Sequence, residues 1–217
     1  MKKLSALTNG SERPRSYLIA ATLRDAIYRG ELVEGEQLFQ SALADQLGVS
    51  PIPLREALKQ LESEGLVTFV GRRGAVVTGL ADSDAQEIYD MITWLELGLL
   101  ERAFPYYRPG YLEALCPLLD RMEAEEDPIE WKEMNCEFHT SLYTPSDRPM
   151  ILDQLSVLRR QVDRYIRSHL EMMRQQSEND HREILRALMI KDLPLATSHL
   201  RKHLCTTSDT LQKLMKK

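Results

Sequence analysis

Residues 43–67 read LADQLGVSPIPLREALKQLESEGLV, and this stretch decides the fold of the N-terminal part of the chain. Its first five residues place leucine and alanine side chains at helical spacing, and Gly48 ends that helix because glycine readily adopts a positive φ. Ser50 is suited to cap a second helix, in which Pro51 takes the first position, where a missing N–H is tolerated. Two short helices joined by a sharp turn predict a helix-turn-helix, whose second helix can enter the major groove of DNA.

The second predicted helix has an apolar face and a basic face. Three leucines recur every three or four residues and are expected to point inward. Arg55, Lys59 and Ile52 then point elsewhere. A hairpin is expected next, because LVTFV and AVVT flank the turn Gly71-Arg72-Arg73-Gly74. A hairpin with arginines at its tip is typical of the wing of a winged helix and suits phosphate or minor-groove contact.

These residues resemble the DNA-binding domain of GntR-type bacterial transcription regulators, from near Tyr17 to the end of the hairpin. The resemblance implies a winged helix that binds operator DNA. The family often carries Arg-Thr where Pro51 and Ile52 stand here, an arginine at Gln37 and an acidic residue at Gln40, so its operator sequence cannot be carried over. The residues expected to contact DNA are Gln40, Ser50, Pro51, Ile52, Arg55, Lys59, Arg72, Arg73 and Gly74.

The composition indicates an ordinary globular protein. The chain has 217 residues, of which 43% are hydrophobic and 28% charged, enough for two small domains with their own cores. No apolar run approaches the roughly 20 residues that cross a bilayer, and no signal peptide is recognised. Cys116, Cys136 and Cys205 show no paired spacing, so we expect a cytoplasmic protein.

The net charge of −5 is unevenly distributed. Residues 1–80 contain 10 Lys+Arg and 9 Asp+Glu, a net charge of +1, whereas residues 81–217 contain 18 and 24, a net charge of −6. Because the N-terminal part is not strongly basic, we expect DNA affinity to depend on a local basic patch and on the doubled contacts of a homodimer.

A domain boundary is expected near residues 79–83, where helical periodicity replaces the strand pattern. The fold class is therefore mainly α, with a winged helix-turn-helix over 14–80 after a flexible tail (1–13), and an antiparallel helical bundle over 81–217. Trp94 and Trp131 are expected in its core. The expected helices cover residues 82–105, 109–125, 129–143, 148–173, 177–190 and 192–214.

Histidines on three of these helices can converge on a metal ion. Asn135 and His139 are four residues apart, so both project from one helix face. His181 begins an apolar stripe, and His203 lies on the buried side of the last helix, where His199 is a competing ligand. Three imidazoles with one oxygen ligand can bind a divalent metal. A histidine beside an apolar stripe is more often a hydrogen-bonded core residue, and this alternative stays open.

The bundle resembles the FCD effector-binding domain of the FadR branch of GntR regulators. The family motif D-x-x-x-H, a histidine that opens a helix and R-x-H correspond to Asn135 and His139, to His181, and to Arg201 and His203. The resemblance implies a divalent metal, zinc or nickel, that helps to hold a small organic acid as effector. The proposed metal ligands are Asn135, His139, His181 and His203.

The same resemblance implies that residues 81–217 bind the effector and mediate dimerisation, and six helices are closer to its VanR-like subgroup than to the seven-helix FadR subgroup. Arg164 and Tyr165 are expected effector contacts, because the family often places Arg and Tyr there. Two departures weaken the analogy. Asn135 replaces the family's aspartate and removes one negative charge from the metal ligands, and Ile92 stands where an arginine is common.

These patterns predict a ligand-responsive transcription regulator, a repressor, that binds a palindromic operator as a homodimer. A DNA-binding protein with a purely structural bundle is the first alternative. A metal hydrolase fused to a helix-turn-helix is the second, and it requires a general base beside an open metal position. Glu137 lies two residues before His139 and points away from its face, so no enzyme activity is expected.

Overall fold

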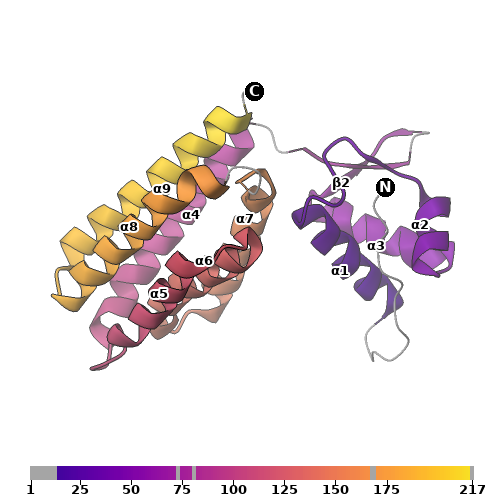
Figure 1. Cartoon of the computed structure of the whole chain (residues 1–217). Helices are drawn as coiled ribbons and strands as arrows, with labels where there is room; N and C mark the ends of the chain where they lie inside the picture. The colour runs from indigo at the N-terminus through magenta and orange to yellow at the C-terminus, as the bar shows by residue number, and fades with distance from the viewer. Residues whose placement is uncertain (1–13, 72–73, 80–81, 167–169, 216–217) are drawn as a thin grey trace. The chain divides into compact units, whose positions relative to one another are not determined.

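The chain forms two compact units, Met1–Leu80 and Ala81–Lys217 (Figure 1). The structure is a computed structural model that describes residues 14–71, 74–79, 82–166 and 170–215. The predicted tail at residues 1–13 lies outside these ranges. Within them, no helix combines the length and the apolar character that a bilayer-crossing segment requires.

Within its described residues, the first unit is a winged helix with three α-helices and a small sheet. Its elements are α1 (Arg15–Tyr28), β1 (Gln37–Leu38), α2 (Gln40–Leu47), α3 (Pro51–Ser63), β2 (Val67–Phe69) and β3 (Ala75–Val77). β3 lies between β1 and β2 and pairs antiparallel with both. The helix-turn-helix is thus α2 and α3, and β2 and β3 form the predicted hairpin of the wing.

The turn between α2 and α3 follows the predicted chemistry at one residue and departs from it at another. Gly48 adopts the left-handed conformation, with φ 64°. Ser50 precedes α3 as predicted, but its side chain makes no capping hydrogen bond. An N-cap hydroxyl usually accepts from the amide of the second or third helical residue. The third is Pro53, which has no N–H, so only the amide of Ile52 could donate to the serine, and that bond is not formed.

The buried side chains of this unit are apolar in all the residues that the structure describes. Leu54, Leu58 and Leu61 point inward as predicted, and α3 packs against α1. Arg24 on α1 forms an ion pair of 2.6 Å with Glu64 at the end of α3. The packing fixes one face of α3 and leaves the opposite face exposed to solvent.

The second unit is an all-α bundle, which confirms the mainly α fold class. In the described residues its helices are α4 (Asp82–Ala103), α5 (Cys116–Ala124), α6 (Pro128–Tyr143), α7 (Pro149–Ile166), α8 (Leu170–Met189) and α9 (Leu193–Met215), with 3-10 turns at Phe104–Tyr106, Glu113–Leu115 and Thr144–Ser146. α9 packs against α4 and α8, and α7 packs against α4 (Figure 1).

Three predicted helices have the wrong boundaries. The helix expected over 148–173 spans parts of two elements, α7, which ends at Ile166, and α8, which begins at Leu170. The break expected at 175–177 lies inside α8, since glutamine and serine are tolerated in a helix that tertiary packing supports. The segment 109–125 contains α-helix only in its last part, as α5.

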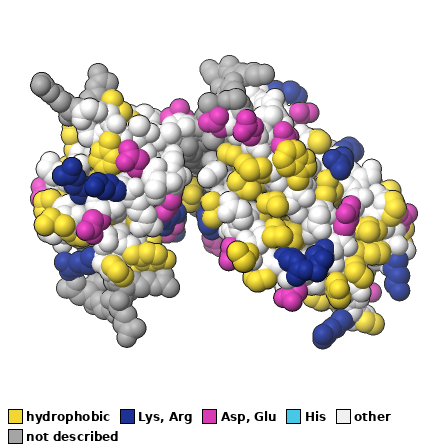
Figure 2. Space-filling view, turned by 180° about the vertical axis from the view of Figure 1, so that it is seen from behind, with side chains coloured by type: hydrophobic (Ala, Val, Ile, Leu, Met, Phe, Trp, Pro, Cys, Tyr) yellow, Lys and Arg dark blue, Asp and Glu magenta, His cyan; other side chains and the backbone are white. Residues whose placement is uncertain are grey.

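The expectation for the two tryptophans is half right. Trp131 is buried, but Trp94 is 69% exposed and faces away from the buried stripe of α4. Met91 on the same helix is also exposed. Figure 2 shows hydrophobic side chains on the surface of the bundle.

Candidate functional site

Three buried histidines from three helices of the bundle lie close together. His139 comes from α6, His181 from α8 and His203 from α9, and one ring nitrogen of each lies within 4.8 Å of the others. Each histidine lies on the apolar stripe of its helix, so the packing that buries the stripes also brings the three rings together. The arrangement offers three nitrogen ligands around one point.

His181 is the most informative of the three. Its side chain is fully buried, and neither ring nitrogen has a hydrogen-bond partner among the described residues. Such an unsatisfied buried group destabilises a fold by roughly 1–3 kcal/mol. Burial lowers the pKa of His181 well below its ordinary value, and the charges of His203 and Arg159 act in the same direction. The ring is therefore neutral and keeps a lone pair that a metal ion can use.

The other donors also fit a divalent transition metal. Burial, with the charge of Arg159, lowers the pKa of His139 well below its ordinary value. Neutral imidazole is the form that binds metals. Nitrogens that share a tetrahedral zinc lie roughly 3.3 Å apart. Since the three ring nitrogens already lie within 4.8 Å of one another, small ring movements would complete such a site.

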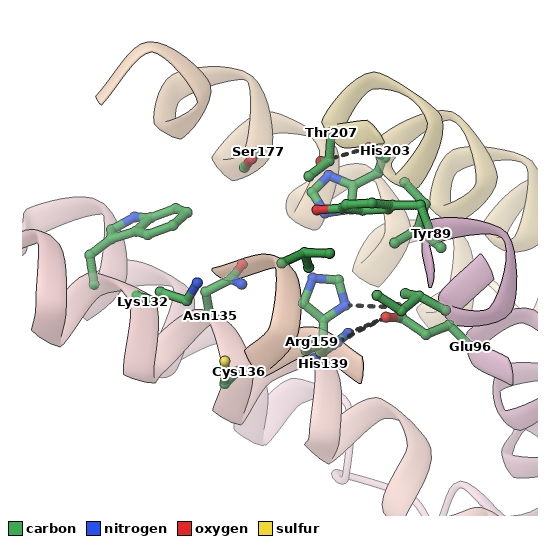
Figure 3. Close-up of a pocket in the computed structure, with 14 residues that line it drawn as sticks. Tyr89, Glu96, Lys132, Asn135, Cys136, His139, Arg159, Ser177, His203 and Thr207 are labelled. Atoms are coloured by element: carbon green, nitrogen blue, oxygen red, sulfur yellow. Dashed lines mark hydrogen bonds and ion pairs between the residues drawn. The ribbon is translucent and has the colours of Figure 1, made fainter. Parts of the chain in front are cut away.

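A buried polar network lies behind His139. Glu96 on α4 is fully buried, and its Oε2 lies 3.6 Å from Nδ1 of His139. Tyr143 donates a hydrogen bond of 2.6 Å to Oε2. Nε of Arg159 donates one of 2.9 Å to Oε1 (Figure 3). Burial lowers the pKa of Arg159, but the charge and hydrogen bond of Glu96, together with Tyr143 and Cys136, raise it overall. The network holds the imidazole with Nδ1 toward Glu96, which leaves Nε2 for another partner.

His203 has a carboxylate partner of its own. Asp180 Oδ2 lies 3.4 Å from Nδ1 of His203, and Gln176 donates a hydrogen bond of 2.8 Å to Asp180 Oδ1. Although partial burial raises the pKa of Asp180, the hydrogen bonds from His203 and Gln176 bring it below its ordinary value. Carboxylates that accept the second N–H of a ligand histidine are common in metal sites.

A cavity of about 80 Å³ lies beside the histidines. In Figure 3, Asn135 and His139 reach it from α6 and His203 reaches it from α9. One water needs roughly 10–15 Å³, so the cavity has room for a small organic ligand. Its lining residues are Tyr89, Ile92, Glu96, Trp131, Lys132, Asn135, Cys136, His139, Arg159, Val162, Ser177, His203, Leu204 and Thr207.

The remaining predicted residues of the bundle have different positions. Ile92 lines the cavity. His199 is half-buried on α9 and does not belong to the histidine cluster. Arg164 and Tyr165 fall in the last turns of α7, and their side chains lie outside what the structure describes.

The sequence prediction missed Glu96 and Arg159, although a signal was present. Glu96 follows Ile92 by one helical turn, and Arg159 follows Leu155 by one turn, so both stand on buried apolar stripes. Charged residues of opposite sign at such positions on two helices indicate a buried ion pair. Asp180 carried no comparable signal beyond its position next to His181.

The predicted DNA-binding residues lie on the exposed side of the winged helix. Ser50, Pro51, Ile52, Arg55 and Lys59 are exposed along α3 and the turn before it. This face is the one that enters the major groove in helix-turn-helix proteins.

Two further predicted contacts flank this helix. Gln40 begins α2 and is half-buried, and Gly74 directly precedes β3 with φ 79°. Arg72 and Arg73, predicted at the wing tip, lie outside the described residues.

Comparison with known families decides the classification. Residues 17–77 match the bacterial regulatory proteins of the gntR family, and residues 87–206 match the FCD domain, which spans more than half of the chain. The chain belongs to the GntR family. It is a DNA-binding transcription regulator with an FCD domain, and the matched families contain regulators rather than enzymes, which confirms the prediction that the chain is not an enzyme.

Relatives of this GntR protein match it over most of its length. The gluconate operon transcriptional repressor of Bacillus subtilis (strain 168) is 27% identical over 206 residues, which cover 90% of this chain and 84% of the relative. The HTH-type transcriptional repressor GlaR of Escherichia coli (strain K12) is 27% identical over 206 residues, which cover 89% and 94%.

Solved structures of GntR proteins have the same fold. E. coli McbR/YncC has a TM-score of 0.73 at 23% identity and covers 93% of this chain and 98% of its own. A GntR family member from Pseudomonas syringae pv. tomato str. DC3000 has a TM-score of 0.57 at 30% identity and covers 95% and 90%. The winged helix and the helical bundle are thus both shared with known regulators.

Proposed function

We propose that this GntR protein is a cytoplasmic, homodimeric repressor whose bundle binds a divalent metal and a small carboxylate effector. The observation that carries the proposal is His181, a fully buried imidazole with two unsatisfied nitrogens beside two further buried histidines. A structural bundle has no use for this arrangement, because an apolar side chain of similar volume would avoid the loss of hydrogen bonds to water. A metal ion would compensate the lost hydrogen bonds by coordinating one nitrogen of each of the three histidines.

In this proposal His139, His181 and His203 hold zinc or nickel, and Asn135 offers an amide oxygen in place of the family's carboxylate. A bound metal would supply a positive charge that attracts a carboxylate ligand. Glu96 and Asp180 fix the orientation of His139 and His203 through their Nδ1 atoms. The amide in place of aspartate leaves the ligand set neutral, so we expect moderate metal affinity.

The effector would enter the cavity beside the metal. Lys132 and Arg159 among its lining residues carry positive charge, which favours an anion, although Arg159 is already paired with Glu96. The cavity volume limits the effector to a small molecule. Arg164 and Tyr165 are proposed as further contacts, and the side chains at these positions are the natural next targets for mutation.

Two copies of the winged helix would bind the two half-sites of a palindromic operator. Arg55 and Lys59 on α3, with Arg72 and Arg73 on the wing, would supply the positive charge, and residues 81–217 would hold the dimer together. The names of the two relatives, both repressors, support repression. The effector changes operator affinity only as far as it binds the DNA-competent and incompetent arrangements of the dimer differently.

Metal analysis combined with thermal unfolding tests the proposal. The purified protein is expected to contain one metal ion per chain, to unfold at a lower temperature after chelation, and to regain stability with zinc or nickel. A panel of small carboxylates should then raise the unfolding temperature of the metal-loaded protein and shift its affinity for operator DNA. A purely structural bundle would contain no metal and would respond to neither treatment.

A further inference from the structure

We infer that Ile52 recognises the 5-methyl group of a thymine in each operator half-site. Ile52 is the second residue of α3 and is 74% exposed, although it is one of the most apolar side chains in the chain. A single exposed apolar residue is common on protein surfaces. This one lies in the first turn of the recognition helix, where side chains of helix-turn-helix proteins contact base edges. The inference rests on the DNA binding of the GntR family.

The surroundings of Ile52 carry few hydrogen-bond donors. Pro51 and Pro53 flank it, and neither has a backbone N–H. The side chains of Pro51 and Ile52 are both exposed and offer only apolar surface to a partner. A base edge that packs against these two side chains would therefore lose hydrogen bonds to water without regaining them, unless it presents an apolar group.

The major groove presents one such group in ordinary DNA. Adenine, guanine and cytosine expose donors and acceptors there, whereas thymine adds the methyl group on C5. Contact with this methyl removes apolar surface of both Ile52 and the thymine from water. The Ile52 side chain already points outward in the free protein, so it need not move to make the contact. The chemistry of the first turn thus selects an A·T pair by van der Waals contact.

The position of Arg55 predicts where the thymine lies in the operator. Ile52 and Arg55 are three residues apart and therefore neighbours on one helix face, with Cβ atoms roughly 5–6 Å apart. Base pairs are stacked roughly 3.4 Å apart. If Arg55 binds a guanine in the usual bidentate way, the thymine read by Ile52 lies about one or two base pairs from that guanine.

The test uses the full-length protein and a duplex selected by it from a random pool. Each thymine of the selected duplex is replaced by uracil, which lacks only the methyl group, and affinity is measured by fluorescence anisotropy. One position per half-site should show a loss of roughly fourfold, the value expected for one buried methyl. Substitution in both half-sites should give a loss of roughly 16-fold.

The variant Ile52→Ser assigns the contact to its residue. Serine and isoleucine have similar helix propensities, and the side chain is exposed, so the unfolding temperature should not change. In this variant the same uracil substitution should have no effect. The inference fails if the parent tolerates uracil at every position, or if the loss persists in Ile52→Ser. If the parent binds no duplex at all, operator binding itself fails, which is a separate result.

Discussion

The winged helix and the bundle differ in where they keep their polar residues. Among the described residues, the buried side chains of the winged helix are apolar, and its DNA-binding candidates are exposed along α3. The bundle buries Glu96, Asp180 and three histidines. A surface that reads DNA can be added to an ordinary core, whereas an interior polar site lowers the stability of the domain until its ligand binds. The first domain should therefore fold well without a ligand, and the second should depend on one.

The largest effect is expected from the exposed face of the winged helix. Arg55→Ala should weaken operator binding by about 2–6 kcal/mol, because each of two half-sites loses a contact of about 1–3 kcal/mol. The unfolding temperature should stay constant, since Arg55 is exposed. Gel-shift titration at moderate salt measures the loss.

Lys59→Ala is the matched control, because the loss of a phosphate contact weakens binding to operator and to unrelated DNA alike. Unchanged operator affinity in Arg55→Ala would show that α3 is not the recognition helix.

The next largest effect is expected in the interior of the bundle. There the change in stability caused by one substitution should have opposite signs with and without bound metal. His181→Leu should stabilise the metal-free protein by about 1–3 kcal/mol, because it removes a buried group that lacks hydrogen bonds. With zinc or nickel in excess, the parent should gain stability and the variant should not, so their order reverses. Thermal unfolding with and without chelator measures both. Equal destabilisation under the two conditions would identify His181 as an ordinary core residue.

Asn135→Asp should make the bundle depend more strongly on bound metal, while the winged helix stays independent of it. A carboxylate restores the negative charge that the family motif carries, so metal affinity should rise by roughly tenfold, at the lower end of the effects seen when groups around a metal are changed. Competition with a coloured chelator measures the affinity. Thr140→Asp adds the same charge at an exposed position on the same helix and should leave the affinity nearly unchanged. Equal effects of the two variants would exclude Asn135 from the site.

The smallest effect belongs to the ion pair of the winged helix. Burial raises the pKa of Glu64, but the hydrogen bonds and charge of Arg24 outweigh it and lower the pKa. Its contribution is therefore present above the ordinary pKa of a glutamate and is lost as the pH falls through the lower folded value. Glu64→Gln should cost about 0.5–1 kcal/mol at neutral pH, because the pair is partly exposed. Urea unfolding should show this difference at pH 7 and its disappearance in strong acid.

The two domains also differ in how far their sequences predict them. The helix-turn-helix is encoded locally, through the αL position of Gly48 and the inward leucines of α3, so its elements could be predicted residue by residue. Only the capping bond of Ser50 was wrong, and Pro53 removes one of the two amides that usually donate to such a cap. Local chemistry therefore suffices for this domain.

The bundle depends on contacts between distant segments. Spacing predicted that His139, His181 and His203 face inward, but it could not show which rings meet, and the buried pair of Glu96 and Arg159 links residues that are 63 positions apart. The exposure of Trp94 has the same origin, since apolar character alone does not tell which face of a helix is covered. Such features require the packed structure.

The most direct test of the interior site is equilibrium dialysis of metal-free protein against zinc, for the parent and for His181→Leu. We expect the parent to bind one zinc ion per chain and the variant to lose most of this binding. Absence of binding by the folded parent, or equal binding by both proteins, would contradict this expectation.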